Sequence, residues 1–481
     1  MTPPGEVGNA AGLMEGARMV QLEVPDLDGG LRAKLVSPAK ALAEAGAAMC
    51  TIMFGLTQAD DVYESPASSA ANGYPDLVMR PDLATLRALP WCEATVAVLC
   101  DLYGGDGAVS ELEGRGAAWT EERGTSDEGR RRLKGAPQAS AEALFPLAPR
   151  TVLRTVVERC ADLGFEARFA AEWEFCVVRR HDEAHPARLV PLGRTMNAYS
   201  SLRLRELRPL AQAFFERMDG VGIAVEAVHT ELGHGMVEFA LAHAPAMEAA
   251  DHASRAKAYL KELCGERGLV ATFMPKWRAG APTSGCHFHQ SLWRNGSNEF
   301  AGPGGALSPL ARHYLAGQLA TMTDFGVLFN PSVNAFRRLQ PGTWTPATAS
   351  WGVDNRTAAI RAIIGSPKAV RLEHRRPGAD VNPYLAIAAM LAGGLHGIAG
   401  ELEPPDPATA DAYADARFPR LPATLDDAIA ALRDSPVAPD LLGREFVRHY
   451  LLSREVELRL WREWETAQVT EWEQRRYFET A

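Results

Sequence analysis

Two alternating segments near the start of the chain predict a pair of β-strands. Residues 17–36 read A-R-M-V-Q-L-E-V-P-D-L-D-G-G-L-R-A-K-L-V, so two runs of alternating apolar and polar residues flank a turn with two glycines. Side chains two positions apart share one face of a strand, and each run therefore has one apolar face. We also expect a helix at residues 40–47 and a strand at residues 94–102, whereas the Gly/Pro/Ala-rich first residues predict a loose tail.

Helical spacing becomes clear from residue 150 onwards. The segment R-T-V-L-R-T-V-V-E-R-C-A-D-L-G repeats apolar residues at helical spacing and ends in Gly164, which favours a helix terminus. The pattern then predicts a strand at residues 165–178, a helix at residues 246–266, strand pieces within 274–292 and a long charged helical region at 441–478. Strands and helices mix without regular β-α-β alternation, so the predicted class is α+β.

A polar, strongly charged stretch separates these two regions. Residues 107–138 show neither helical nor strand periodicity, which is typical of a solvated surface loop. A flap that becomes ordered over a ligand is the alternative interpretation.

Composition and charge exclude several classes of function. The net charge of −10 argues against a surface that binds nucleic acid phosphates or anionic lipid. The seven cysteines are odd in number and form no C-x-x-C pair, as expected for reduced thiols in a cytoplasm. Signal-peptide features are missing from the first residues, and the longest apolar stretch, residues 386–399, is too short to span a bilayer. We therefore expect a soluble cytoplasmic protein.

Paired carboxylates and paired histidines are the first candidates for chemistry. Glu172 and Glu174 lie two positions apart in an apolar strand, so both project from one face, where they repel each other unless a cation lies between them. His287 and His289 form a second such pair. Each pair alone is more often structural, but further acidic residues follow in the chain. The combined candidates are five carboxylates and one imidazole, a set that suits Mg²⁺ or Mn²⁺: Glu172, Glu174, Glu231, Glu238, His287 and Glu373.

Five arginines complement this acidic set within forty residues. Arginine binds carboxylates and phosphates through two parallel hydrogen bonds and keeps its charge. Divalent cations beside several arginines indicate phosphoryl transfer, and without a G-x-x-x-x-G-K-[ST] motif any nucleotide is held by another arrangement. The five are Arg338, Arg356, Arg361, Arg371 and Arg375.

From about residue 18 to its end, the chain resembles the glutamine synthetase family in the form without the large regulatory insertion. A-E-W-E-F resembles the family's G-x-E-x-E-F, and V-E-A-V-H-T-E-L-G-H-G-M-V-E resembles its V-E-x-H-H-E-…-G-Q-x-E. A-T-F-M-P-K, G-C-H-F-H-Q-S-L, N-R-T-A-A-I-R, R-L-E-H-R and N-P-Y-L-A-I-A-A-M-L-A-G-G-L-H-G-I are also similar.

The resemblance implies a domain plan and a two-step reaction. The expected units are a flexible tail at 1–16, a small β-grasp-like domain at 17–108, a charged loop at 109–145 and a catalytic domain at 146–481. ATP would phosphorylate the side-chain carboxylate of glutamate, and an amine would then displace the phosphate. Two or more Mg²⁺ or Mn²⁺ ions per site, with ATP as cosubstrate, and active sites between the subunits of a ring are also implied.

The resemblance also implies roles for individual residues. One metal would be bound by Glu174, Glu231 and Glu238, and the other by Glu172, His287 and Glu373. ATP would contact Glu226, His289, Ser291, Lys368 and Arg371. The transferring phosphate would face Arg356 and Arg361, and Glu231 is the candidate to accept the proton of the amine. The substrates would be bound by Arg338, Arg375, Tyr199, Trp344, Gly55, Gln58 and Thr283.

Three departures from the family pattern concern the second substrate. Ammonia-using members carry R-L-x-P-G-Y-E-A-P, whose glutamate helps to bind ammonium, and this chain has Trp344 there. Their M-F-D-G-S-S is M-F-G-L-T-Q here, which gives Gly55 and Gln58, and their N-G-S-G is P-T-S-G at residues 282–285. The predicted function is therefore a ligase that joins glutamate to an aromatic, alkyl or hydroxyalkyl amine.

Other interpretations stay open at this point. The chain could be a glutamine synthetase with a relocated base, or a non-catalytic scaffold, although a scaffold has no need of buried, repelling carboxylates. Trp344 could simply pack under its loop. The Tyr413 region lacks the family's N-L-Y-D-L context, so we predict no control by adenylylation.

Overall fold

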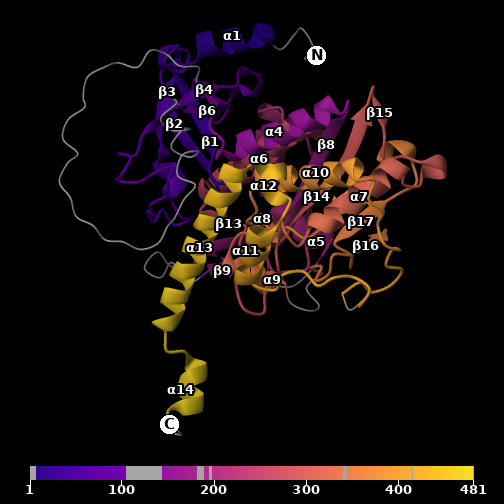
Figure 1. Ribbon diagram of the computed structural model, residues 1–481. Helices are drawn as coiled ribbons and strands as arrows, with labels where there is room; N and C mark the ends of the chain where they lie inside the picture. The colour runs from indigo at the N-terminus through magenta and orange to yellow at the C-terminus, as the bar shows by residue number, and fades with distance from the viewer. Residues whose placement is uncertain are drawn as a thin grey trace.

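The computed structural model describes residues 7–104, 143–180, 189–193, 198–339, 344–413 and 415–479. A smaller N-terminal sheet lies beside a larger unit of sheet and helices (Figure 1). The predicted α+β class is confirmed. The predicted charged loop at 109–145 lies almost entirely outside the described residues.

The N-terminal sheet has the strand order β2-β1-β6-β4-β3. Strands β1 and β6 run parallel, and β1 pairs with β2 in the antiparallel hairpin that the alternation predicted. The elements of this part are α1 (Val7–Gly16), β1 (Met19–Pro25), β2 (Leu31–Val36), α2 (Pro38–Ala41), β3 (Ala47–Cys50), η1 (Thr51–Gly55), β4 (Asp76–Pro81), η2 (Leu83–Thr85), β5 (Arg87–Ala88), β6 (Thr95–Gly104) and β7 (Ala143–Leu144).

Two predictions for this region were wrong. Residues Val7–Gly16 form helix α1 rather than a loose tail, and Met14 is buried against the core. The helix expected at 40–47 ends at Ala41, because Gly46 adopts a φ of 64° in the turn that leads into β3. A side chain at Gly46 would collide with the Met79 carbonyl of the neighbouring strand, so this turn requires glycine.

The larger sheet has the strand order β10-β11-β8-β14-β18-β17-β16. Its longest strand, β8, contains both Glu172 and Glu174, and residues 273–285 form a loop where strand pieces were expected to begin. The strands are β8 (Glu166–Arg180), β9 (Leu189–Pro191), β10 (Val225–Thr230), β11 (Met236–Leu241), β12 (Ala244–Pro245), β13 (Leu269–Thr272), β14 (Cys286–Arg294), β15 (Ser297–Asn298), β16 (Trp351–Val353), β17 (Ile360–Ile363) and β18 (Arg371–His374).

Helices cover one face of this sheet and leave the other for polar side chains. On the covered face, Lys257 of α6 lies over the Trp173 ring, and Gln290 bonds with Tyr314 and Gln318 of α7. The helices are α4 (Pro149–Asp162), α5 (Ser201–Gly220), α6 (Ala246–Gly265), α7 (Pro309–Thr321), α8 (Gly326–Phe329), α9 (Val333–Arg338) and α10 (Pro383–Ala399), with short 3₁₀ turns η3 (Pro303–Gly305) and η4 (Pro367–Ala369). The apolar α10 is a buried core helix, and no helix in the described ranges has both the length and the apolar composition needed to cross a membrane.

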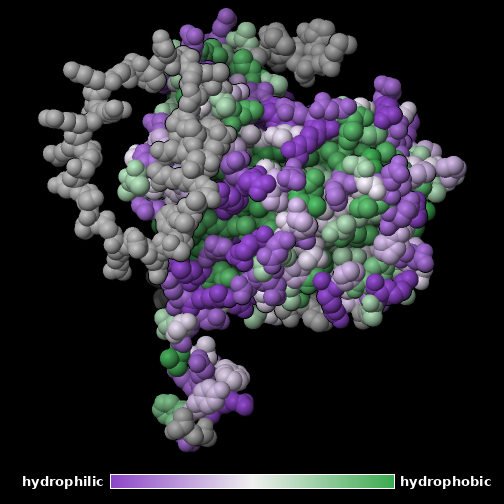
Figure 2. Space-filling model, in the orientation of Figure 1, coloured by the Kyte–Doolittle hydropathy of each residue, from purple (hydrophilic) through white to green (hydrophobic). Residues whose placement is uncertain are grey.

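The C-terminal helical region is divided into separate helices. They are α11 (Leu425–Asp434), α12 (Ala438–Leu442), α13 (Arg444–Thr466) and α14 (Glu471–Tyr477). Gly443, with a φ of 96°, separates α12 from α13, and Thr470 begins α14 with a capping box. The end of α13 and all of α14 stand clear of the body (Figure 1), and hydrophilic and hydrophobic residues alternate over this projecting end (Figure 2).

Candidate active site

Strand register brings acidic residues from separate segments onto the uncovered face of the larger sheet. Glu238 of β11 lies opposite Glu174 of β8, and His287 of β14 lies opposite Glu172. Glu373 of β18 lies opposite His289, two positions after His287 on β14. The name acidic row is used for five of these residues: Glu172, Glu174, Glu238, His287 and Glu373. Five of the six predicted ligands therefore lie on adjacent strands, and Glu231 lies in the turn after β10.

Two groups in this region have donor atoms close enough together to bind a cation. Glu172, Glu238 and His287 form one group, with ligand atoms within 4.8 Å of one another. Glu231, Glu238 and His229 form the other, with the Nε2 atom of His229 lying 3.1 Å from Glu231 and 3.2 Å from Glu238. Glu238 thus belongs to both groups.

His229 was missed by the sequence analysis. Its position two residues before Glu231 was the available signal, but only the pairing of β10 with β11 shows that it lies opposite Glu238. Two predicted ligands have other partners: Glu174 accepts a hydrogen bond from the Gly285 backbone N–H at 2.5 Å, and Glu373 is paired with arginines.

The charges of the acidic row fit a divalent cation. Burial and the neighbouring charge of Glu172 raise the pKa of Glu238 to about 11. Burial opposes ionisation of Glu172 as well, but the neighbouring His287 and His289 rings hold its pKa below the usual range. The buried Nδ1 of His287 has no hydrogen-bond partner among the described residues and lies 3.5 Å from a Glu172 oxygen. A cation would satisfy this nitrogen and replace the proton on Glu238, and the oxygen-rich donor set suits Mg²⁺ or Mn²⁺.

Arginines adjoin the acidic row at Glu373. The Nη1 atom of Arg361 lies 2.9 Å from one Glu373 oxygen, and Arg375 pairs with the other. Burial opposes ionisation, but the charge of Arg375 outweighs it and lowers the pKa of Glu373 to about 2. Arg361 also donates to Asp354 from its Nε at 2.9 Å.

Arg338 lies on the other side of the acidic row, deep in the fold. It donates to the Arg376 backbone carbonyl at 3.0 Å, and its guanidinium is so near Gly285 that a side chain there would displace it. Burial lowers its pKa to about 10, although Glu174 acts in the opposite direction. Gly285 therefore permits the close approach of Arg338 to the row.

Three of the predicted ATP residues, His289, Ser291 and Arg371, lie on the same strands as the acidic row. Arg371 donates to the Nδ1 atom of His289 at 3.2 Å, and His289 lies 3.0 Å from Glu172. Ser291 follows His289 on the same face of β14. Glu226 and Lys368 are exposed, on β10 and on the 3₁₀ turn before β18, respectively.

The predicted substrate residues do not all meet at the acidic row. Tyr199 stacks on His229 with ring centroids 4.8 Å apart and remains 75% exposed. Trp344 is 54% exposed with a φ of 58°, and residues 340–343 just before it lie outside the described ranges. Thr283 is buried in the loop before β14. Arg356 is exposed, and its positive charge opposes the rise in the pKa of the Tyr199 hydroxyl that burial causes.

The Gly55 segment lies in the N-terminal domain of the same chain. Gly55 packs against the Tyr63 carbonyl and Ser68, and the carbonyl of Phe54 accepts a hydrogen bond from His449 of α13 at 2.7 Å. Gln58 is exposed in the same segment. The contacts of this segment are with other residues than the acidic row.

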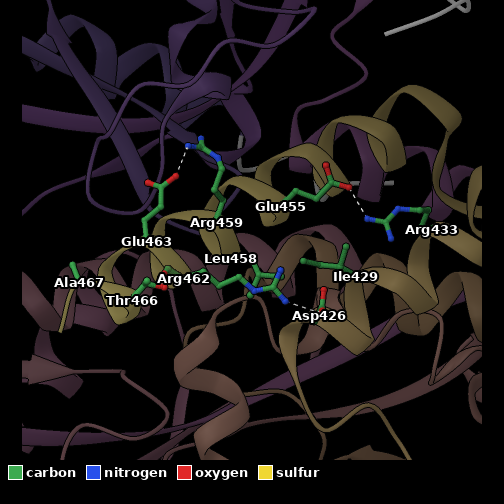
Figure 3. A pocket seen from close by; sticks show the side chains of 10 residues that line it. All are labelled: Asp426, Ile429, Arg433, Glu455, Leu458, Arg459, Arg462, Glu463, Thr466 and Ala467. Carbon is green, nitrogen blue, oxygen red and sulfur yellow. Dashed lines mark hydrogen bonds and ion pairs between the residues drawn. The ribbon is translucent and has the colours of Figure 1, made fainter. Parts of the chain in front are cut away.

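A separate groove of about 690 Å³ lies between α11 and α13 (Figure 3). Three ion pairs line it, Arg433–Glu455, Arg459–Glu463 and Arg462–Asp426. These charges are already paired, and none of the predicted site residues lies there. The acidic row is therefore the better candidate for the active site.

Comparison with known proteins gives consistent matches along the whole chain. The family description "Glutamine synthetase, catalytic domain" matches residues 146–477. The chain is 35% identical to the γ-glutamylethanolamide synthetase GlnA4 of Streptomyces coelicolor, over 96% of this chain and 92% of that protein. It is 32% identical to a glutamate–isopropylamine ligase of a Pseudomonas species, over 96% and 95% of the two chains.

Similarity extends to ammonia-using proteins and to solved structures. A glutamine synthetase of Thermotoga maritima is 30% identical over 96% of this chain and 97% of that protein. A structure described as a GmaS/ADP complex superimposes with a TM-score of 0.77 at 28% identity, covering 98% of this chain and 99% of the other.

Proposed function

The chain belongs to the glutamine synthetase family, and we propose that it uses ATP to join the γ-carboxylate of L-glutamate to an organic primary amine through γ-glutamyl phosphate. Trp344 is the observation that carries this proposal. It stands where ammonia-using members of the family carry a glutamate, and it leaves more than half of its surface open. Removal of a carboxylate weakens the attraction for ammonium, and an indole offers apolar contact to the carbon part of a larger amine.

The acidic row and its arginines have separate tasks in this reaction. The residues that would hold divalent cations are Glu172, Glu238 and His287 in one group, and His229, Glu231 and Glu238 in the other. Bound cations would neutralise the negative charge of ATP and of the developing acyl phosphate.

The arginines would orient the two anionic substrates. We assign Arg361 and the exposed Arg356 to the transferring phosphate, since a guanidinium offers two parallel donors to a pair of phosphoryl oxygens. Arg338 and Arg375 would bind the carboxylates of glutamate. The buried position of Arg338 supports this role, because a carboxylate that reached it would be held in a site with little water.

The amine would meet a surface that is partly aromatic. Tyr199, stacked on His229, presents an exposed ring near Glu231, which we assign as the acceptor of the amine's proton. Contact between an alkylammonium and an aromatic face contributes about 0.5–2 kcal/mol. Alkyl, hydroxyalkyl and aromatic amines all fit this description.

We further propose that the chain works in the cytoplasm as a ring with active sites between subunits. Gly55 and Gln58 support this, because they belong to the N-terminal domain, where Gly55 packs against Tyr63 and Ser68 rather than against the acidic row. A neighbouring subunit's N-terminal domain would bring these positions to the amine site.

The direct test compares ammonia with a panel of primary amines, using the wild-type protein and Trp344→Glu. We expect the wild type to use an organic amine better than ammonia, and the variant to shift specificity toward ammonia by roughly tenfold to a hundredfold. Trp344→Phe is the matched control and should keep the amine preference. A wild-type protein that prefers ammonia to every amine would contradict the proposal and favour a glutamine synthetase.

A further inference from the structure

The chain that follows Trp344 is held against a second segment, residues 419–422. Residues 345–350 are mostly buried, although Trp344 itself is more than half exposed. The backbone nitrogen of Ala349 donates to the Pro419 carbonyl at 2.9 Å, and a second backbone bond, of 3.0 Å, joins residues 347 and 421. The two segments run antiparallel at this point, and the first of them leads back to Trp344.

A guanidinium continues this pairing where the backbone cannot. Pro346 and Pro422 come next in the two segments, and proline has no N–H to donate to the opposite carbonyl. Arg376 supplies both donors. Its Nη1 atom donates to the Pro346 carbonyl at 2.6 Å, and its Nη2 atom donates to the Pro422 carbonyl at 2.8 Å. The two segments are therefore joined by a side chain, at a position two residues from Trp344.

Arg376 makes these bonds deep in the fold. Its side chain is almost fully buried. Burial, together with the positive charge of Arg338, lowers its pKa to about 9, and no carboxylate of the described residues opposes this effect. A buried guanidinium that has no carboxylate partner is costly. What Arg376 provides in return is geometry, because a planar guanidinium fixes two acceptors at once.

The backbone of Arg376 lies beside the arginines that adjoin the acidic row. Its carbonyl accepts a hydrogen bond from the Nη1 atom of Arg338 at 3.0 Å. Arg375, the residue before it, is paired with Glu373. Arg376 therefore connects two parts of the candidate site, since its backbone contacts the arginines proposed to bind glutamate and its side chain holds the segment of Trp344.

We propose that Arg376 is a positioning residue that sets the place of the Trp344 indole relative to the glutamate site, and that it thereby determines which amines are used. The proposal deepens the proposed ligase function and rests on it. Arg376 acts through Pro346 and not by contact with a substrate. Loss of its donors would free Pro346, and Trp344 with it, so the apolar wall would no longer meet the carbon part of the amine in one place.

The test compares kcat/KM for the best organic amine with kcat/KM for ammonia, in the wild type, in Arg376→Lys and in Arg376→Met. Lysine keeps the charge but cannot reproduce two parallel donors, and methionine removes both donors. We expect the preference for the organic amine to fall by roughly tenfold, mainly through KM for the amine. KM for ATP and for glutamate should change little, because the carbonyl that Arg338 uses belongs to the backbone. If methionine prevents folding, the lysine variant alone decides the test.

A double variant separates positioning from a general loss of stability. In Trp344→Ala the wall is already gone, so the addition of Arg376→Lys should change the amine preference by less than about twofold. Arg255→Lys is the matched control, because Arg255 of α6 is also buried and donates to a backbone carbonyl, that of Thr85 in the N-terminal domain, at 2.7 Å. The control should lower the melting temperature and leave the amine preference unchanged.

Three results would overturn the proposal: an unchanged amine preference in Arg376→Lys, an equal rise in KM for all three substrates, or effects that multiply in the double variant. A wild type that prefers ammonia to every amine would instead contradict the proposed function. That result is seen with the wild type alone, so the two failures are distinguishable.

Discussion

At the scale of single residues, Glu238 has the most demanding position in the candidate site. It contributes an oxygen to both cation-binding groups, and its pKa is strongly raised by burial and by the neighbouring charge of Glu172. A residue shared by two groups couples their occupancy, whereas Glu231 and His287 each belong to one group.

Glu238→Gln should therefore weaken binding at both groups, by at least about tenfold each. The amide keeps the size of the side chain but removes its charge. Glu231→Gln should weaken one group and leave the other. Titration with Mn²⁺, in which the fraction of bound ion is recorded at each concentration, measures the affinity of each cation-binding group. If the two variants lose binding to the same extent and at the same group, Glu238 is not shared.

Much of this site could be predicted from the sequence, but not every residue that belongs to it. The i, i+2 spacing was enough to place Glu172 and Glu174 on one face of a strand. His229 could not be assigned, because its contact with Glu238 depends on the register between two strands that no local pattern records. The contact of Arg361 with Glu373 likewise depends on the pairing of β17 with β18.

At the scale of elements, close approach of α7 and α10 supports the covered face of the sheet. A Cβ atom at Gly397 of α10 would lie 2.1 Å from the His313 carbonyl oxygen and 2.5 Å from the Gly317 backbone nitrogen of α7, which is too close for any side chain. The two helix backbones therefore touch directly. Glycine is needed here for space, not for an unusual φ.

Gly397→Ala should destabilise the protein by about 1–3 kcal/mol or more, since the helices must separate. Gly265→Ala is the matched control, because Gly265 ends α6 and, apart from its chain neighbours and its own helix backbone, no atom of the described residues lies within 4 Å of an added Cβ. The control should be neutral or slightly stabilising. Chemical denaturation followed by circular dichroism compares the two. Equal stability of both variants would show that α7 and α10 can move apart at little cost.

Element boundaries were predicted best where the local pattern is strong. The helix expected at 246–266 is found at Ala246–Gly265, and the strand expected at 165–178 is found at Glu166–Arg180. The helix expected at 40–47 failed because the collision at Gly46 involves β4, more than thirty residues along the chain. Such a contact has no signature in the residues around it.

At the scale of the whole molecule, the projecting C-terminal end after α13, residues 467–479, carries several exposed apolar side chains. Aromatic and aliphatic side chains there are open to solvent, with 60% exposure for Trp472, 71% for Val469 and 85% for Phe478. Exposed clusters of this kind mark contact surfaces. A contact with another copy of the chain is consistent with the proposed ring.

Truncation after Ala467 should therefore reduce the size of the assembly. Light scattering coupled to gel filtration measures the mass of the full chain and of the truncated form. Arg475→Ala, which breaks only an exposed ion pair with Glu471, is the control and should leave the mass unchanged. A truncated protein with the mass of the full-length assembly would exclude this end from self-association.

The packing of Gly55 constrains how the choice of amine could change over evolution. A Cβ atom at this position would lie 2.6 Å from the Tyr63 carbonyl, so aspartate cannot be introduced there until the segment around Tyr63 has moved. Trp344, by contrast, is exposed and can be exchanged alone. A carboxylate can therefore be introduced directly at Trp344, whereas at Gly55 it requires an earlier change near Tyr63 that makes room for the side chain.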